Sequence, residues 1–217
     1  MKMKINKQLS DISVKYMRII SLMLFCITLL IVRIKLTQSL IYFFLLWNLF
    51  LAMLPLCITT VIGKKRIKKI FFYILVLIWL LLLPNAPYII TDFIHINKNH
   101  SIPQWFDILM LASFAITGLL FGLASMKEMQ RIIANRFNRK FSVYFIIIIC
   151  FSSGYGIYLG RMLRYNSWDI LKDPWFLIID MITSPFNTET YLTAWGMTLG
   201  FGVLLYLTFS IYNNHKK

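Results

Sequence analysis

The chain has 217 residues, of which 59% are hydrophobic and only 14% are charged, and its mean hydropathy is +0.71. A single soluble core cannot bury so much apolar surface, so the composition excludes an ordinary soluble fold. The formal charge of +15 would indicate a nucleic-acid partner in a soluble protein, but here the basic residues lie between long apolar runs. That arrangement is typical of charges that contact anionic lipid head groups. Membrane lipids are therefore the expected partners, and nucleic acid is not.

Six uncharged runs predict six helices that cross a lipid bilayer. Most of them approach the roughly 20 residues that a tilted helix needs to span the hydrocarbon. The spans are expected near residues 16–34, 40–62, 70–91, 108–126, 141–160 and 190–212. The first uncharged run is short, but the basic residues at its ends can extend their charged groups to the interface. The predicted fold is an all-α, polytopic transmembrane helix bundle, with residues 1–217 as one transmembrane domain.

The first run also resembles a signal peptide, because a basic stretch precedes it. No small-residue cleavage site follows it, and Phe25 before Cys26 does not fit a lipoprotein signal. We therefore expect an uncleaved first span. The cysteines Cys26, Cys57 and Cys150 all lie inside apolar runs and form no Cys-x-x-Cys pair. Neither a disulfide framework nor a common metal site is expected from them.

Basic residues are distributed unequally between alternate connections. The N-terminus, the second and fourth loops and the C-terminus together hold 17 Lys and Arg, whereas the first, third and fifth loops hold 6. The positive-inside rule places the first group, and with it both termini, in the cytoplasm. Six of the eight acidic residues lie on the other side: Asp92, Asp107, Asp169, Asp173, Asp180 and Glu189. The outer face is therefore where any chemistry of this protein is expected.

The third span ends in Leu83-Pro84-Asn85-Ala86-Pro87-Tyr88, in which two prolines lie three residues apart. Each proline removes a backbone donor, so the helix must break or bend here. Carbonyls freed at membrane depth must be buried in protein or line a wet cavity. The break is therefore either part of a site or a helix end at the interface. Asn48, inside the second span, must also find a partner within the bundle.

Three residues near the third loop are candidate catalytic groups. If a helix resumes after Pro87, Asp92 and His95 share one face and can form a hydrogen-bonded pair or act as base or metal ligands. Asp107 opens the fourth span, where capping of the helix explains it equally well. One Asp and one His are too few for a metal site, so the sequence names neither a metal nor a cofactor.

The densest polar cluster follows the fifth span, in Gly160-Arg161-Met162-Leu163-Arg164-Tyr165-Asn166-Ser167-Trp168-Asp169. Arg161 and Arg164 share a helical face and can hold a phosphate or a carboxylate in the forked geometry of guanidinium. Topology alone disfavours arginines on an outer face. We therefore predict that Arg161, Arg164, Asn166 and Asp169 bind substrate. Contact with lipid phosphates is the alternative.

A short apolar helix is expected at residues 174–183 in the last outer loop, with Asp173 as its N-cap and Pro185 after its end. About ten residues cannot span a bilayer, so this helix should lie in the interface or dip into the bundle as a lid over the polar cluster.

Small residues recur at four-residue spacing in three spans. The pairs are Gly118 and Gly122, Gly156 and Gly160, and Gly196 and Gly200. Such spacing lets helices approach closely. We predict packing faces at these glycines, with Gly156, Gly160, Pro84, Pro87 and Asn48 as structural residues. A membrane-protein partner or a second copy of the chain could use the same faces.

Three strings of this chain together resemble a bacterial membrane family, domain of unknown function 1361. They are Leu83-Pro84-Asn85-x-Pro87-Tyr88-x-x-Thr91-Asp92-x-x-His95, Trp105-Phe106-Asp107 and Gly160-Arg161-x-x-Arg164-x-Asn166-Ser167-Trp168-Asp169. The resemblance covers about residues 46–186. It implies a multi-pass protein of the bacterial cell membrane and implies no activity.

Three functions fit these residues. The first is an outer-face site that binds or processes a lipid-linked or anionic envelope substrate, with Arg161 and Arg164 on the anion and Asp92 with His95 as base or metal ligands. The second is a small transporter or channel whose path is lined by Asn48 and the proline break. The third is a non-catalytic partner subunit. The sequence leaves open whether the protein is an enzyme.

The charge distribution predicts the topology directly. Reporter fusions after Lys69, Arg139 and Lys217 should report cytoplasm, and fusions near Lys98 and Lys172 should report the exterior, because 17 basic residues on one side outweigh 6 on the other. Paired phosphatase and fluorescent-protein fusions measure both locations. An exterior report from the Lys69 fusion would overturn the orientation.

Overall fold

The computed structural model of the chain describes residues 2–64, 67–96, 102–165, 169–172 and 174–214, and within them the regular secondary structure is entirely helical. The elements in chain order are α1 (Lys2–Thr37), η1 (Ile41–Phe43), α2 (Phe44–Lys64), α3 (Lys69–Leu82), α4 (Asn85–Tyr88), η2 (Ile89–His95), α5 (Gln104–Arg136), α6 (Arg139–Arg161), α7 (Asp169–Lys172), α8 (Pro174–Thr183) and α9 (Tyr191–Asn214). Among the described residues, six segments are long and apolar enough to cross a membrane. The predicted all-α bundle of about six spans is confirmed.

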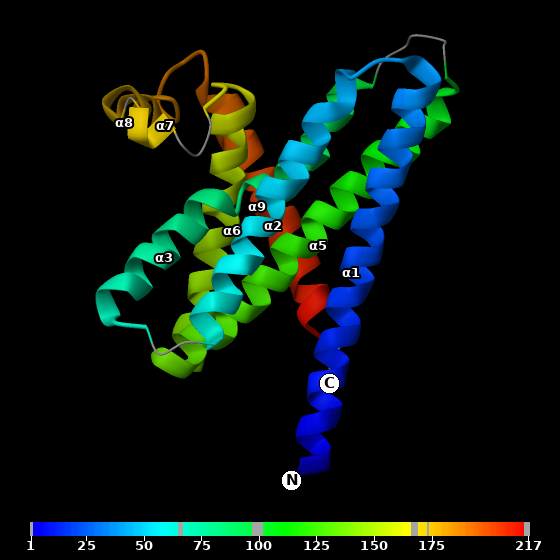
Figure 1. Ribbon diagram of the computed structural model, residues 1–217. Helices are drawn as coiled ribbons and strands as arrows, with labels where there is room; N and C mark the ends of the chain where they lie inside the picture. The colour runs from blue at the N-terminus through cyan, green and yellow to red at the C-terminus, as the bar shows by residue number, and fades with distance from the viewer. Residues whose placement is uncertain (1, 65–66, 97–101, 166–168, 173, 215–217) are drawn as a thin grey trace.

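Helix α5 lies at the centre of the bundle. It contacts α1, α2, α4 and η2 as well as α6 and α9, and α6 and α9 pack against each other beside it (Figure 1). Both termini lie at the same end of the bundle (Figure 1). We call the opposite end, which carries η1, η2, the first turn of α5, the last turn of α6, and α7 and α8, the distal end. The orientation that we predict from the charges would make the distal end the outer one.

The fourth span is longer than its uncharged run. Helix α5 continues to Arg136, whereas the run ends at residue 126. The next turns contain Lys, Glu, Met, Gln and Arg, which are strong helix formers, and Glu128 and Arg131 form an ion pair at 2.6 Å. The chain turns where Asn138 accepts a hydrogen bond from the Phe141 N–H at 2.7 Å and caps α6. Hydropathy locates the membrane-spanning part of such a helix but not its end.

The third span is broken, as the prolines require. Helix α3 ends at Leu82, one turn of α4 follows, and the chain continues as the 3-10 segment η2. The carbonyls near the break are satisfied within the protein, since Asn85 donates to the Leu82 carbonyl and Thr91 to the Tyr88 carbonyl. Leu83, Ala86, Pro87 and Ile89 around the break are buried. The break therefore lies inside the protein rather than against lipid.

Glycines on α5 and α6 make room for this break. A Cβ at Gly118 would lie 2.6 Å from Ile89 Cδ1, one at Gly122 would lie 2.7 Å from Ala86 Cβ, and one at Gly156 would lie 2.5 Å from Pro84 Cγ. At Gly160 the nearest atom is Cε2 of Tyr88, at 3.3 Å. The two glycine pairs therefore flank the proline segment, and α4 fits between α5 and α6 because these positions lack side chains.

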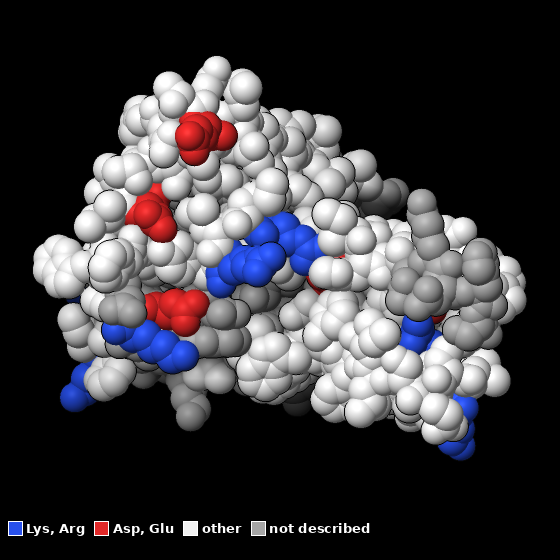
Figure 2. Space-filling model, turned by 90° about the horizontal axis from the view of Figure 1, so that it is seen from above, with Lys and Arg blue, Asp and Glu red and all other residues white. Residues whose placement is uncertain are grey.

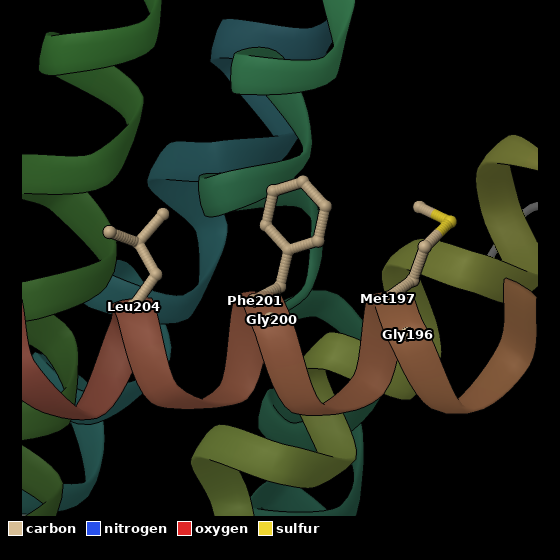
Figure 3. A pocket seen from close by; sticks show the side chains of 5 residues that line it. All are labelled: Gly196, Met197, Gly200, Phe201 and Leu204. Atoms are coloured by element: carbon tan, nitrogen blue, oxygen red, sulfur yellow. The ribbon is translucent and has the colours of Figure 1, made fainter.

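The prediction that Gly196 and Gly200 form a close helix contact is wrong. A Cβ at either of these two glycines would meet no described atom within 4 Å. Instead the two glycines form a shallow apolar hollow with Met197, Phe201 and Leu204 (Figure 3). The close contact between α6 and α9 is made one face away, where Gly154 lies against the Thr198 carbonyl and Gly202 against Phe151. Spacing alone cannot tell which glycines of a helix face a neighbour.

The glycine geometry predicts opposite effects for two alanine substitutions. Gly154→Ala places a Cβ 2.5 Å from the Thr198 carbonyl oxygen, a backbone atom that cannot rotate away, and should destabilise the protein by about 1–3 kcal/mol through overpacking. Gly200→Ala meets open space and should be neutral, or stabilising by up to about 1 kcal/mol through helix propensity. Thermal unfolding of the two purified variants in detergent checks this. Equal loss in both would contradict the assignment of faces.

Candidate functional site

Two ion pairs lie at the distal end of the bundle. Arg161 at the end of α6 pairs with Asp92 of η2, and Arg33 near the end of α1 pairs with Asp107 in the first turn of α5. Seen from this end, a group of basic side chains lies near the middle of the face, and the most visible acidic side chains lie to one side of it (Figure 2). Burying charge costs several kcal/mol per ion unless it is paired and hydrogen-bonded, so each pair must be considered with all its partners.

Asp92 is held by two donors from two other spans. Its Oδ2 accepts a hydrogen bond from Asn48 Nδ2 at 2.9 Å, and its Oδ1 lies 3.3 Å from an Nη of Arg161. The carboxylate is 1% exposed. Asn48 thus has its partner inside the bundle, and η2 is joined by side chains to both α2 and α6. With both oxygens occupied, Asp92 acts first as the group that orients Arg161.

Arg161 also bonds to the backbone of the broken third span. Its second Nη donates to the Thr91 carbonyl at 2.7 Å, and the first Nη approaches the Tyr88 hydroxyl at 3.3 Å. Its guanidinium carbon lies 5.6 Å from the centre of the Tyr88 ring. The arginine therefore neutralises Asp92 and donates to a backbone carbonyl of η2 with the same group.

Asp107 belongs to a separate pair. Its two oxygens face Arg33 Nε at 2.8 Å and an Nη of Arg33 at 3.4 Å, and both residues are 5% exposed. The Arg33 guanidinium stacks on the Tyr42 ring, 4.1 Å from its centre. Sequence reasoning treated Arg33 as an interfacial charge and missed this pair. The available signal was an arginine at the edge of one apolar run and an aspartate at the start of another, on the same face of the membrane.

Tyr42 and His95 lie between the two pairs. The Tyr42 hydroxyl donates to the His95 carbonyl at 2.7 Å, so the aromatic ring under Arg33 is bonded to the segment that carries Asp92. The His95 ring is exposed and meets the edge of Phe44, with ring centres 5.4 Å apart. His95 is therefore close to the Asp92 pair, but in this structure it is not a hydrogen-bonded partner of Asp92.

The remaining predicted binding residues follow α6. Arg164 is exposed and has a left-handed backbone with φ of 60°, a conformation that costs a non-glycine residue about 1–2 kcal/mol. The turn lets the Tyr165 N–H donate to the Leu159 carbonyl at 3.1 Å. Asp169 begins α7, and Asn166 lies outside the described residues. The structure thus joins Arg161, Asp92 and Asn48 and leaves Arg164 exposed. The predicted helical face shared by Arg161 and Arg164 is wrong, because α6 ends at Arg161 and the left-handed turn places Arg164 outside the helix.

The described residues offer no metal site of the usual kind, since no three His, Cys, Asp or Glu side chains gather among them. The distal end instead presents two cationic groups. The guanidinium of Arg161 is oriented by a carboxylate and a carbonyl, and Arg164 follows three residues later. Such groups recognise phosphate and carboxylate oxygens.

The fold and this site define a multi-pass helical membrane protein with two buried ion pairs at one end of the bundle. A family model matches residues 47–208, and the chain therefore belongs to the family described as protein of unknown function (DUF1361). The resemblance seen in the three strings is confirmed, and it extends to the last span. No curated protein and no solved structure matches the chain. Helix α1 lies outside the matched region, yet it supplies Arg33 to Asp107.

The Asp92 pair predicts a strong effect of substitution. Asp92→Ala leaves Arg161 and Asn48 without their acid and should cost about 3 kcal/mol of stability, the lower end of the range for breaking a buried pair, because Arg161 keeps some exposure. Asp92→Asn, which retains a hydrogen-bonding side chain, should cost less. Unfolding in detergent measures both. Glu189→Ala, at an exposed acid of the same end, is the control and should change stability by about 0.5 kcal/mol or less.

Proposed function

We propose that the protein binds, at the distal and outer end of the bundle, the anionic group of a lipid-linked or envelope substrate. The observation that carries this proposal is the pair of arginines at the end of α6. Arg161 is held in one orientation by Asp92, Thr91 and Tyr88, and Arg164 follows three residues later, after the end of the helix, with an exposed side chain.

The two arginines contribute differently. The charge of Arg161 is balanced by Asp92, so its contribution is the fixed direction of its N–H groups. Among the described residues Arg164 forms no ion pair, so its positive charge is the one that an anion can neutralise. An arginine outside the membrane gains nothing from topology and here also adopts a strained backbone.

The other predicted residues have subordinate roles in this proposal. Asp92 orients Arg161, and exposed His95 is the group suited to transfer a proton if the substrate is processed. Asn166 and Asp169 follow Arg164 and would contact the polar part of the substrate. Asp107 would act through Arg33 and Tyr42 as a support of the same end rather than as a base on the substrate.

The transporter alternative has less support. It needs Asn48 and the proline break to line a path, but Asn48 donates to Asp92 and Pro87 is buried. The partner-subunit alternative would use open glycine faces, of which α9 has one at Gly196 and Gly200. The bacterial cell membrane is the location that the family resemblance implies, and we include it in the proposal.

Binding of an anionic lipid tests the proposal. Short-chain phosphatidylglycerol is titrated into the delipidated protein, and bound lipid is counted by native mass spectrometry. A hydrogen bond to a charged group contributes about 1.5–3 kcal/mol, so Arg164→Gln should weaken binding about tenfold or more. Lys172→Gln, at an exposed base of the same end, is the matched control and should leave the affinity unchanged. Equal affinities of both variants and the unaltered protein would reject the arginine site.

A further inference from the structure

Helix α8 is apolar and almost entirely uncovered. Of its ten residues only Leu177 is buried, while Trp175 is 75% exposed, Phe176 68% and Ile182 62%. Phe186, directly after the helix, is 80% exposed. Large apolar side chains exposed together in this way mark a surface that contacts something other than water.

Hydrogen bonds hold α8 against the side of the bundle. The Tyr155 hydroxyl donates to the Met181 carbonyl at 2.7 Å, and the Tyr165 hydroxyl donates to Asp180 Oδ2 at 2.7 Å. Tyr155 precedes the last residue of α6 by six positions, which is about 9 Å along a helix. The end of α8 therefore lies alongside the last turns of α6, and Figure 1 shows α8 beside the distal end of that helix. The chain after α8 is tied to α9, since Trp195 Nε1 donates to the Pro185 carbonyl at 3.1 Å.

The charge pattern of α8 identifies what covers it. Asp180 is the one charged residue of the helix, and its carboxylate is turned toward Tyr165 rather than outward. The exposed residues are Trp, Phe and Ile, the types enriched where a membrane protein meets the upper acyl chains. Leu192 in the first turn of α9 is also 70% exposed. Lipid that contacts the start of α9 would also reach α8, since Trp195 of α9 is bonded to Pro185, just after α8.

We infer that α8 is embedded in the outer leaflet beside the distal end of α6, and that it brings the Arg164 turn to the level of the lipid phosphates. Tyr165 joins the two, because it follows Arg164 in the chain and its hydroxyl holds Asp180. The anion at the arginine site is then the phosphate of a lipid that enters sideways from this leaflet. This last step rests on the proposed function, whereas the position of α8 does not. In this position α8 does not cover the polar cluster as a lid, since Arg164 stays exposed.

Photolabelling of the full-length protein in nanodiscs tests the position of α8. Two lipids carry the same diazirine in the upper acyl chain, one with a phosphatidylglycerol and one with a phosphatidylcholine head group, and adducts are located by peptide mass spectrometry. We expect both lipids to label Trp175, Phe176 and Ile182 as strongly as Leu192 of α9. Hydroxyl radicals generated in the water should leave Trp175 and Phe176 unmodified.

The same experiment tests the ligand. Residues 163–165 should receive more adducts from phosphatidylglycerol than from phosphatidylcholine, the preference should disappear in Arg164→Gln, and excess inorganic phosphate should not reduce it. Oxidation of α8 by hydroxyl radicals without lipid adducts would place it in water, and absence of both would show that protein covers it. Either result overturns the inference about α8. If residues 163–165 still receive more adducts from phosphatidylglycerol, the proposed function stands. Labelled α8 without that preference overturns the proposed function and the lipid ligand with it. Loss of the preference to inorganic phosphate assigns the site to a soluble anion and overturns the lipid ligand alone.

Discussion

Backbone carbonyls inside a membrane protein must be satisfied without water, and the third span makes this requirement acute. Pro84 and Pro87 break the helix, and the chain continues as a 3-10 segment whose carbonyls also receive side-chain donors. Arg161 donates to one of them and Tyr42 to another. Asp92 balances the charge of the half-buried Arg161, and Asn48 donates to the second oxygen of Asp92. The interrupted third span thus gathers polar residues of two other spans around it.

The same break explains the packing of the bundle centre. Helices α5 and α6 approach the broken segment closely because Gly118 and Gly122 of α5 face Ile89 and Ala86, and Gly156 of α6 faces Pro84. The glycine pairs and the proline segment are therefore parts of one contact. The Arg33 pair then connects α1 to this centre through Asp107 of α5.

The residues of the proposed site differ from one another in exposure. Asp92 and Asp107 are buried and hold other groups in place, whereas Arg164 and His95 are exposed. In the proposed anion site, Asp92 orients Arg161, and Arg164 supplies the charge that an anion neutralises. Helix α8 is bonded to Tyr165, the residue after Arg164, and in our inference it would place this site next to lipid.

Composition and runs of uncharged residues were enough to predict the all-α bundle and its six spans, because crossing hydrocarbon demands a length of apolar chain that one dimension can show. The two prolines predicted the break, and the position of Asn48 inside an apolar run predicted that it needs a partner. The ion pairs could not be predicted, because the sequence places Asp92, Asp107, Arg33 and Arg161 at the same end without indicating which acid faces which arginine. Spacing also could not distinguish Gly156, which faces Pro84, from Gly200, which faces no described atom, because both belong to glycine pairs with the same four-residue spacing. These choices depend on the rotation of each helix about its axis, and that is decided only when all six pack together.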